Sequence, residues 1–125
     1  MQKRIYYHDT DCGGVVYYAN YLKYLEEART EYMRDRGLDL KELAGNGLLF
    51  VVKKVEIEYK SPARYADLLE ISTKLGKVRN VSFEFLQEVK REDRVLISAI
   101  TTLVCIDKDF RPCSMREELA NALIK

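Results

Sequence analysis

Hydrophobic and polar residues repeat with a helical period in the first third of the chain. From Tyr18 onward, Leu22, Leu25 and Met33 fall on one side of a predicted helix, and charged residues occupy the opposite side. Gly37 follows the last periodic residue, where a glycine commonly caps a helix. The pattern therefore predicts a long helix of about five turns that begins at Tyr18.

The period elsewhere is two residues, which is the period of a β-strand. Strands are predicted for residues 2–8, 51–60, 69–75, 81–89 and 95–106. The last of these is apolar on both faces, as is typical of a central strand that is covered on two sides. A short helix is expected for residues 38–44. Another is expected to run to Leu123, with Ser114 and Glu117 at the spacing of a capping box.

The order of these elements indicates an α+β architecture. Strands that are linked by short turns pair antiparallel, and a sheet with one polar face needs cover on its other face. The long helix is the only predicted element large enough to provide that cover. We therefore expect residues 1–125 to form a single domain in which a curved antiparallel sheet of about five strands wraps a long central helix, with a short helix at the C-terminus.

Composition excludes several classes of protein. Apolar residues make up 47% of the chain and charged residues 33%, which favours a folded domain over a disordered one. The 21 basic and 20 acidic residues nearly cancel, so nucleic-acid binding is disfavoured. No run is long enough for a membrane span, and the N-terminus lacks the apolar core of a signal peptide, so we expect a cytoplasmic location. Cys12, Cys105 and Cys113 have no paired spacing and indicate free thiols, with no metal site.

The stretch before the long helix is a poor choice for stability alone. Asp11 precedes the pair Gly13 and Gly14, and each glycine loses extra backbone entropy on folding. Glycines let a ligand's carbonyl oxygen approach the backbone, and the N–H groups at a helix N-terminus can polarise it. A carboxylate nearby can activate water or attack the carbonyl itself. Taken alone, such an aspartate is more often a cap of a backbone N–H group.

This stretch also resembles a family signature. The run Tyr7-His-Asp-Thr-Asp11 followed by Gly13-Gly-Val-Val-Tyr-Tyr-Ala-Asn-Tyr-Leu22 is similar to the motif of hotdog-fold acyl-CoA thioesterases of the 4-hydroxybenzoyl-CoA thioesterase group, and most similar to their bacterial Tol–Pal-cluster branch. Further segments match at residues 26–31, 59–62 and 81–83, so the likeness spans essentially the whole chain. It implies hydrolysis of acyl-CoA to a free acid and CoA, without a further cofactor. It also implies homodimers with active sites at the subunit boundary, assembled into tetramers.

The resemblance assigns roles to individual residues. Asp11 matches the catalytic carboxylate, and Tyr18 matches the position whose backbone N–H polarises the thioester carbonyl. Tyr18 stands where the Tol–Pal branch usually has histidine and the hydroxybenzoyl enzyme has tyrosine, so an imidazole contribution is not expected. The residues expected to bind substrate are Gly13, Gly14, Tyr17, Val51, Lys77, Arg79, Asn80 and Ser82. Asn80 departs from the resemblance, because the hydroxybenzoyl enzyme has a denser basic cluster at this connector. For Tyr17, packing at the helix start is the preferred interpretation, and Lys77 and Arg79 are equally well explained as solvated turn charges.

Three other functions are weighed against hydrolysis through Asp11. Cys12 beside Asp11, with His8 nearby, could be a thiol nucleophile, but nothing in the sequence directs His8 toward Cys12. A hydroxyacyl dehydratase of the same fold would need a histidine on or before the long helix, and His8 lies in the first predicted strand. A non-catalytic acyl-CoA binding or scaffold module is the third alternative, and the retention of Asp11 with the glycine pair argues against it.

Overall fold

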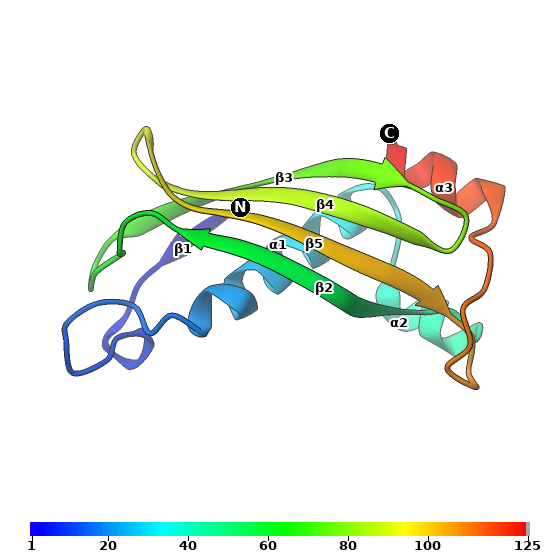
Figure 1. Cartoon of the computed structure of the whole chain (residues 1–125), viewed down its shortest axis with the longest axis horizontal. Helices are drawn as coiled ribbons and strands as arrows, with labels where there is room; N and C mark the ends of the chain where they lie inside the picture. Colours follow the sequence, from blue (N-terminus) through cyan, green and yellow to red (C-terminus); the bar gives the residue numbers. More distant parts are fainter. Residues whose placement is uncertain (125) are drawn as a thin grey trace.

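The computed structural model describes residues 1–124, and within them the chain forms one sheet with three α-helices and a short 3-10 turn (Figure 1). The elements in chain order are β1 (Gln2–Arg4), η1 (Tyr7–Asp9), α1 (Asn20–Asp35), α2 (Leu40–Gly45), β2 (Leu49–Tyr59), β3 (Leu68–Val78), β4 (Ser82–Arg91), β5 (Arg94–Ile106) and α3 (Glu117–Ile124). This confirms the predicted α+β hotdog architecture, with one long helix, a curved sheet and a short C-terminal helix.

The five strands are ordered β1-β3-β4-β5-β2, and every neighbouring pair is antiparallel. β2 pairs with β5 from Leu49 opposite Ile106 to Tyr59 opposite Ile97, so the chain must cross the sheet through residues 60–67 before β3 begins. β4 is the middle strand, and β5 is an interior strand between β4 and β2, as expected for residues 95–106. β5 lies one strand from the edge, and β2 is an edge strand.

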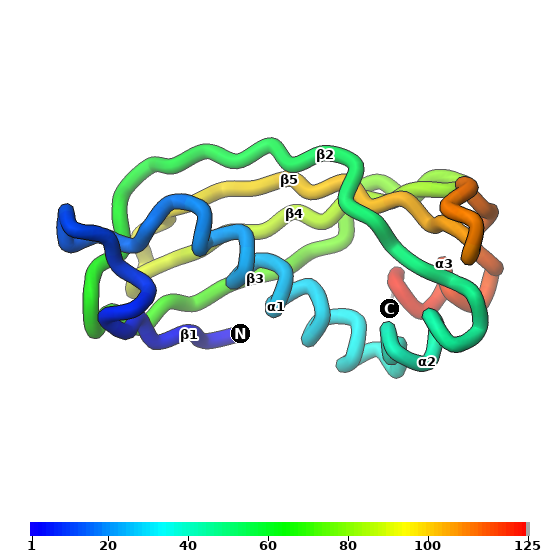
Figure 2. The backbone as a smooth tube through the Cα atoms, turned by 90° about the horizontal axis from the view of Figure 1, so that it is seen from below, coloured from blue at the N-terminus to red at the C-terminus, as the bar shows by residue number. Residues whose placement is uncertain are grey.

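Helix α1 crosses the concave face of the sheet (Figure 2). Tyr21, Tyr24 and Leu25 pack inward, each with at most 2% of its surface exposed, whereas Leu22 is 43% exposed. The predicted apolar stripe was therefore wrong at Leu22. The reason is that the two tyrosines can bury their rings, because their hydroxyls find partners in the Ala63 N–H and Asp9.

A buried polar bridge fixes α1 on the sheet. Gln87 of β4 donates from Nε2 to the carbonyl of Leu25 at 3.0 Å and to Thr73 Oγ1 at 3.1 Å. Its Oε1 accepts a hydrogen bond from Arg29 at 3.3 Å, and burial lowers the pKa of that guanidinium. Because buried polar groups are costly unless they are paired, these contacts hold the helix in one position along the strands.

Three predicted boundaries are corrected. β1 ends at Arg4 instead of residue 8, because the Asp9 N–H donates to the Tyr6 carbonyl and closes the η1 turn. β3 continues to Val78 and takes in part of the predicted connector. α3 begins at Glu117, so Ser114 does not cap it; Met115 N–H donates to the Asn80 carbonyl and holds the preceding segment against the β3–β4 turn. None of the helices within residues 1–124 has the length and hydropathy that a bilayer crossing requires.

Candidate active site

The loop between η1 and α1 is closed by a tight turn around Asp11. Its Oδ1 accepts a hydrogen bond from the Gly13 N–H at 2.8 Å, and its backbone carbonyl accepts one from the Gly14 N–H at 3.0 Å. Gly14 has a φ of +81°, and a Cβ at Gly13 would lie 3.1 Å from Asp11 Oδ1. The turn therefore explains both glycines. The Asp11 side chain does cap a backbone N–H, yet it stays exposed, and among residues 1–124 this is the only hydrogen bond that its carboxylate makes.

The entrance of α1 carries two unused hydrogen-bond donors. Tyr17 N–H donates to the Asp9 carbonyl at 3.0 Å, and Asn20 N–H donates to the Tyr17 carbonyl at 2.8 Å. Tyr18 and Ala19 lie in the turn between these two bonds, so the helix begins at Asn20, two residues later than predicted. Within the described residues, the backbone N–H groups of Tyr18 and Ala19 donate no hydrogen bond. They stand at the positive end of a 16-residue helix.

Aromatic side chains line one side of this entrance. The Tyr59 hydroxyl donates to the Tyr18 carbonyl at 3.3 Å, and the two rings meet edge to face at 6.2 Å. A cavity of about 280 Å³ adjoins them and is lined by Val15, Val16, Tyr18, Tyr21, Tyr59, Lys60, Ser61 and Pro62. The pKa of Tyr17 is raised chiefly by the neighbouring Tyr18 phenol, and the Asp11 carboxylate adds to the shift. The ring centroids of Tyr17 and Tyr18 lie 5.0 Å apart.

Asp9 is a site residue that the sequence analysis missed. It is 5% exposed, and its carboxylate accepts hydrogen bonds from Tyr24 Oη at 2.6 Å and from the Tyr6 N–H at 2.8 Å. Burial alone raises the pKa of Asp9, whereas these two hydrogen bonds lower it. With added attraction from His8 and Lys3, the pKa falls below its ordinary value. Nothing in the sequence separates Asp9 from a solvated loop aspartate except a tyrosine on the inward side of the following helix.

The Tyr24–Asp9 hydrogen bond gives a pH-dependent prediction. Tyr24→Phe should lower the free energy of unfolding by about 1.5–3 kcal/mol at neutral pH, because it removes a hydrogen bond to a buried ionised carboxylate. Since folding lowers the Asp9 pKa below 3.8, the ionised form stabilises the fold above that pH, and the contribution is lost as pH falls through the lower folded value. Urea denaturation of both proteins should show a full gap between pH 5 and 8 that narrows below about pH 4. A gap independent of pH would contradict the assignment.

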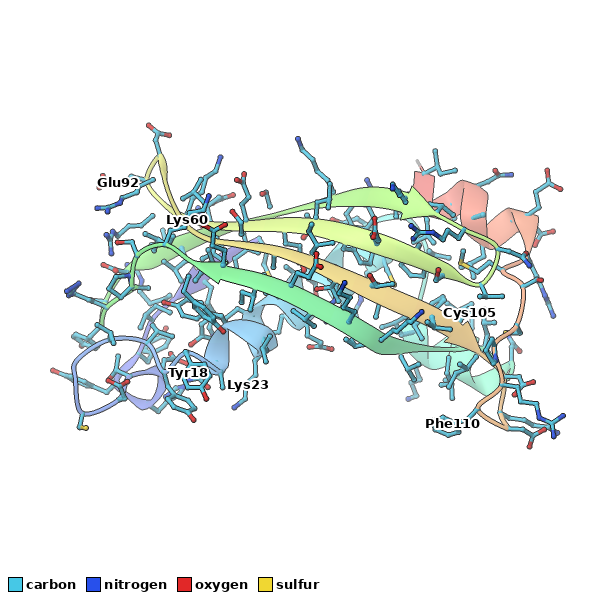
Figure 3. All side chains as sticks on the ribbon, in the orientation of Figure 1. Tyr18, Lys23, Lys60, Glu92, Cys105 and Phe110 are labelled. Carbon is cyan, nitrogen blue, oxygen red and sulfur yellow. The ribbon has the colours of Figure 1, made fainter. Side chains whose placement is uncertain are left out.

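The remaining predicted binding residues lie at the opposite end of the sheet. Val51 is near the start of β2, and Lys77, Arg79, Asn80 and Ser82 surround the β3–β4 turn. The Cys105 N–H donates to the Val81 carbonyl, so this turn lies beside the end of β5. Figure 3 shows Cys105 and Tyr18 at opposite ends of the molecule. A ten-residue strand spans roughly 33 Å, so one chain does not bring the two groups together.

The side chains at that far end are largely solvated. Lys77, Arg79 and Asn80 are exposed, and Lys77 lies within β3 instead of a connector. Arg79 Nη1 lies 3.9 Å from Glu84 Oε2, with about half of the arginine side chain exposed. Ser82 and Val51 are half-buried. These positions leave both charges available to a ligand or to water.

The thiols do not form a second reactive centre around Asp11. Cys12 is exposed, and His8 Nε2 lies 3.7 Å from Asp9 Oδ1 while its ring stacks on Tyr6. The His8 side chain therefore faces Asp9 and Tyr6. At the far end, Cys105 Sγ lies 3.3 Å from Cys113 Sγ, and burial raises the pKa of Cys105 to about 12. Among residues 1–124, no three histidine, cysteine or acidic side chains cluster as a metal site would require.

Known proteins resemble this chain along nearly its whole length. The thioesterase-like superfamily matches residues 6–123. The chain is 43% identical over 105 residues to the acyl-CoA thioester hydrolase YbgC of Escherichia coli, covering 83% of this chain and 78% of that protein. It is 40% identical to the acyl-CoA thioesterase YbgC of Haemophilus influenzae, covering 95% of this chain and 89% of that protein. A hypothetical protein from Aquifex aeolicus, solved by crystallography, superposes with a TM-score of 0.94 at 29% identity, covering 98% and 97% of the two chains.

Proposed function

Since the chain belongs to the thioesterase-like superfamily, we propose that it hydrolyses an acyl-CoA thioester to a carboxylic acid and free CoA, with Asp11 and the amides at the α1 entrance as its machinery. The YbgC relatives are acyl-CoA thioester hydrolases, and this chain is an enzyme of the same class. One observation carries the proposed mechanism. Within the described residues, two unused N–H donors, at Tyr18 and Ala19, stand at the positive end of α1, and the loop that leads to them carries the exposed carboxylate of Asp11.

The donors suit the developing charge of the reaction. Attack on a thioester carbonyl moves negative charge onto its oxygen, and backbone N–H groups at a helix N-terminus stabilise such an oxyanion. The helix dipole adds a partial positive charge of about half an electron. The acyl carbonyl would approach over the Asp11 turn, where Gly13 and Gly14 present no side chain. The sequence assigned this role to Tyr18 alone, and Ala19 now joins it.

Asp11 supplies the attack in one of two ways. As a general base it takes a proton from water, the water oxygen bonds to the carbonyl carbon, and collapse of the tetrahedral intermediate expels CoA as its thiolate. As a nucleophile it displaces the thiolate directly and forms a mixed anhydride that water then hydrolyses. Neither route needs a cofactor beyond the CoA of the substrate. The Tyr18 phenol has no assigned part in either route.

The separation of the two residue groups supports a shared site between two copies. β2 is an edge strand, and it carries Val52 and Val55 with 49% and 37% of their surfaces exposed. Such an exposed edge is a template for pairing with another chain. Antiparallel pairing of two β2 strands would place the start of one beside the end of the other. Val51 of the second copy would then lie near the Tyr18–Tyr59 wall of the first.

The proposed dimer gives a role to each of the remaining predicted binding residues. In the second copy, Lys77 and Arg79 would face the phosphates at the nucleotide end of CoA, with Asn80 and Ser82 as hydrogen-bonding neighbours. Val51 would contact the acyl group. We expect two such dimers to form a tetramer. The three thiols suit a reducing compartment, in agreement with a cytoplasmic enzyme that acts on acyl-CoA.

One assay tests the proposal against a non-catalytic scaffold of the same fold. Purified protein is incubated with short, long and aromatic acyl-CoAs, and the release of free CoA thiol is followed. We expect measurable hydrolysis of at least one class. Tight CoA binding without hydrolysis of any thioester would instead support the scaffold.

A second prediction addresses the thiol alternative. Cys12→Ser should leave kcat within about 2-fold of the wild type, because the His8 imidazole lies against Asp9 and is not placed as a base for the Cys12 thiol. The same thiol-release assay measures it. Loss of turnover in Cys12→Ser, together with retained turnover in Asp11→Asn, would assign the nucleophile to Cys12.

A further inference from the structure

The strongest additional feature is the set of contacts that Asp9 makes with α1. Its backbone carbonyl accepts hydrogen bonds from the Tyr17 N–H at 3.0 Å and from Asn20 Nδ2 at 2.9 Å. Its carboxylate accepts one from Tyr24 Oη, one turn further into the helix. Asp9 therefore contacts α1 at two residues, Asn20 and Tyr24, and contacts the entrance of the helix at Tyr17. We propose that Asp9 is a positioning residue, which holds the Asp11 turn and the α1 entrance in the geometry that hydrolysis needs.

Asp9 does not react itself. It is 5% exposed, and both carboxylate oxygens are occupied, Oδ1 by Tyr24 and Oδ2 by the Tyr6 N–H. A general base or nucleophile must reach water or substrate, which Asp11 can do and Asp9 cannot. The two aspartates of the Asp-Thr-Asp run therefore have different proposed roles, reaction for Asp11 and positioning for Asp9. One faces solvent beside the helix entrance, and the other is buried beneath it.

The Asp11 turn has separate anchors on its two sides. On the C-terminal side of the turn, which leads into α1, the Val16 N–H donates to the Ala63 carbonyl at 2.9 Å, and Val15 forms a bridge with Arg64. On the N-terminal side, the contacts come from Asp9, which lies only two residues before Asp11 and bonds to Tyr17, Asn20 and Tyr24. Its acceptance of the Tyr17 N–H also fixes the peptide that precedes the unused Tyr18 and Ala19 donors. A shift of Asp9 therefore moves the carboxylate of Asp11 and the donors relative to each other.

The expected effect is on turnover more than on binding. This inference rests on the proposed hydrolysis, in which attack and oxyanion stabilisation must occur at one carbonyl. A misplacement of about 1 Å in such a site can cost about 10²-fold in rate. Tyr24→Phe and Asp9→Asn both weaken the Asp9 contacts while they preserve shape. We expect kcat to fall about 10-fold to 100-fold in each, with KM within about 2-fold.

Tyr32→Phe is the matched control. Tyr32 also lies on α1, near the other end of the helix. Its substitution likewise removes one hydrogen bond, which the Tyr32 hydroxyl donates to the Leu123 carbonyl at 3.0 Å. Turnover is measured well below the unfolding temperature of every variant, with the folded fraction checked by circular dichroism. We expect Tyr32→Phe to keep full kcat. Equal kcat in Tyr24→Phe and Tyr32→Phe would overturn the positioning role and leave only a stabilising one.

A second measurement does not depend on activity. Amide hydrogen exchange of the Tyr17 N–H reports whether the Asp9 carbonyl still holds the entrance. We expect exchange at least 10-fold faster in Tyr24→Phe than in Tyr32→Phe. If the wild type hydrolyses no acyl-CoA but this difference appears, the proposed function fails while the anchoring of the entrance stands. If neither the exchange rate nor kcat changes in Tyr24→Phe, the anchoring role of Asp9 is refuted and the proposed hydrolysis is unaffected.

Discussion

Replacing Asp11 with asparagine is expected to lower kcat for acyl-CoA hydrolysis by about 10²-fold or more, the scale of losing a positioned proton-transfer group. Asparagine has no anionic oxygen to accept a proton from water or to attack the carbonyl. Its side-chain oxygen can still accept the hydrogen bond from the Gly13 N–H, which Asp11 Oδ1 accepts at 2.8 Å. The turn is therefore expected to survive, and the change isolates the chemistry. Release of free CoA thiol under saturating substrate measures it.

Asp39→Asn provides the control for this change. Asp39 also sits in an exposed segment and accepts a local backbone hydrogen bond, from the Lys41 N–H at 2.9 Å, but at the start of α2. It should keep full turnover. An Asp11→Asn enzyme with unimpaired kcat would remove Asp11 from the mechanism and leave the α1 entrance as a binding feature only. A loss of activity in both variants would point to a general effect on folding.

The fold could be predicted from the sequence because its long elements have clear periods. The alternation in residues 51–106 and the helical repeat after Tyr18 left few architectures, and a sheet with one polar face required the long helix as its cover. Where local polar contacts compete with the period, the prediction failed. β1 stopped early because Asp9 bonds to Tyr6, and Leu22 turned outward because Tyr21 and Tyr24 could satisfy their hydroxyls in the core.

The candidate site was predictable only in part. Asp11 and the glycine pair stand out because glycine is costly where no special backbone is needed, and the +81° φ of Gly14 supplies that need. Asp9 did not stand out, because its role depends on a hydrogen bond from the hydroxyl of Tyr24, which lies fifteen residues later in the sequence. The distance between Tyr18 and the β3–β4 turn was also beyond sequence reasoning, because it depends on the end of the sheet at which the α1 entrance lies, beside Tyr59 at the end of β2.

The distance between the α1 entrance and the β3–β4 turn leads to a second prediction, which concerns the assembly of two copies. Val55→Glu is expected to convert the proposed dimer into a monomer and to lower hydrolysis by about 10²-fold, because the proposed binding residues of the second copy would no longer reach the α1 entrance. Val55 lies near the middle of β2, so a two-fold axis across paired β2 strands would bring it close to its own copy. Two glutamates there would repel each other. Because Val55 is 37% exposed in the single chain, the monomer itself should lose little stability.

Leu86→Glu tests whether the β2 edge is the relevant surface. Leu86 is 39% exposed and lies on the middle strand β4, so the substitution adds the same charge away from the edge. Light scattering after size-exclusion chromatography gives the oligomeric state of each variant, and thiol release gives its activity. Leu86→Glu should remain at least dimeric and active. A monomeric Val55→Glu protein with full turnover would show that one chain contains a complete site, and the exposed side chains at the β3–β4 turn would then be solvated charges without a role in catalysis.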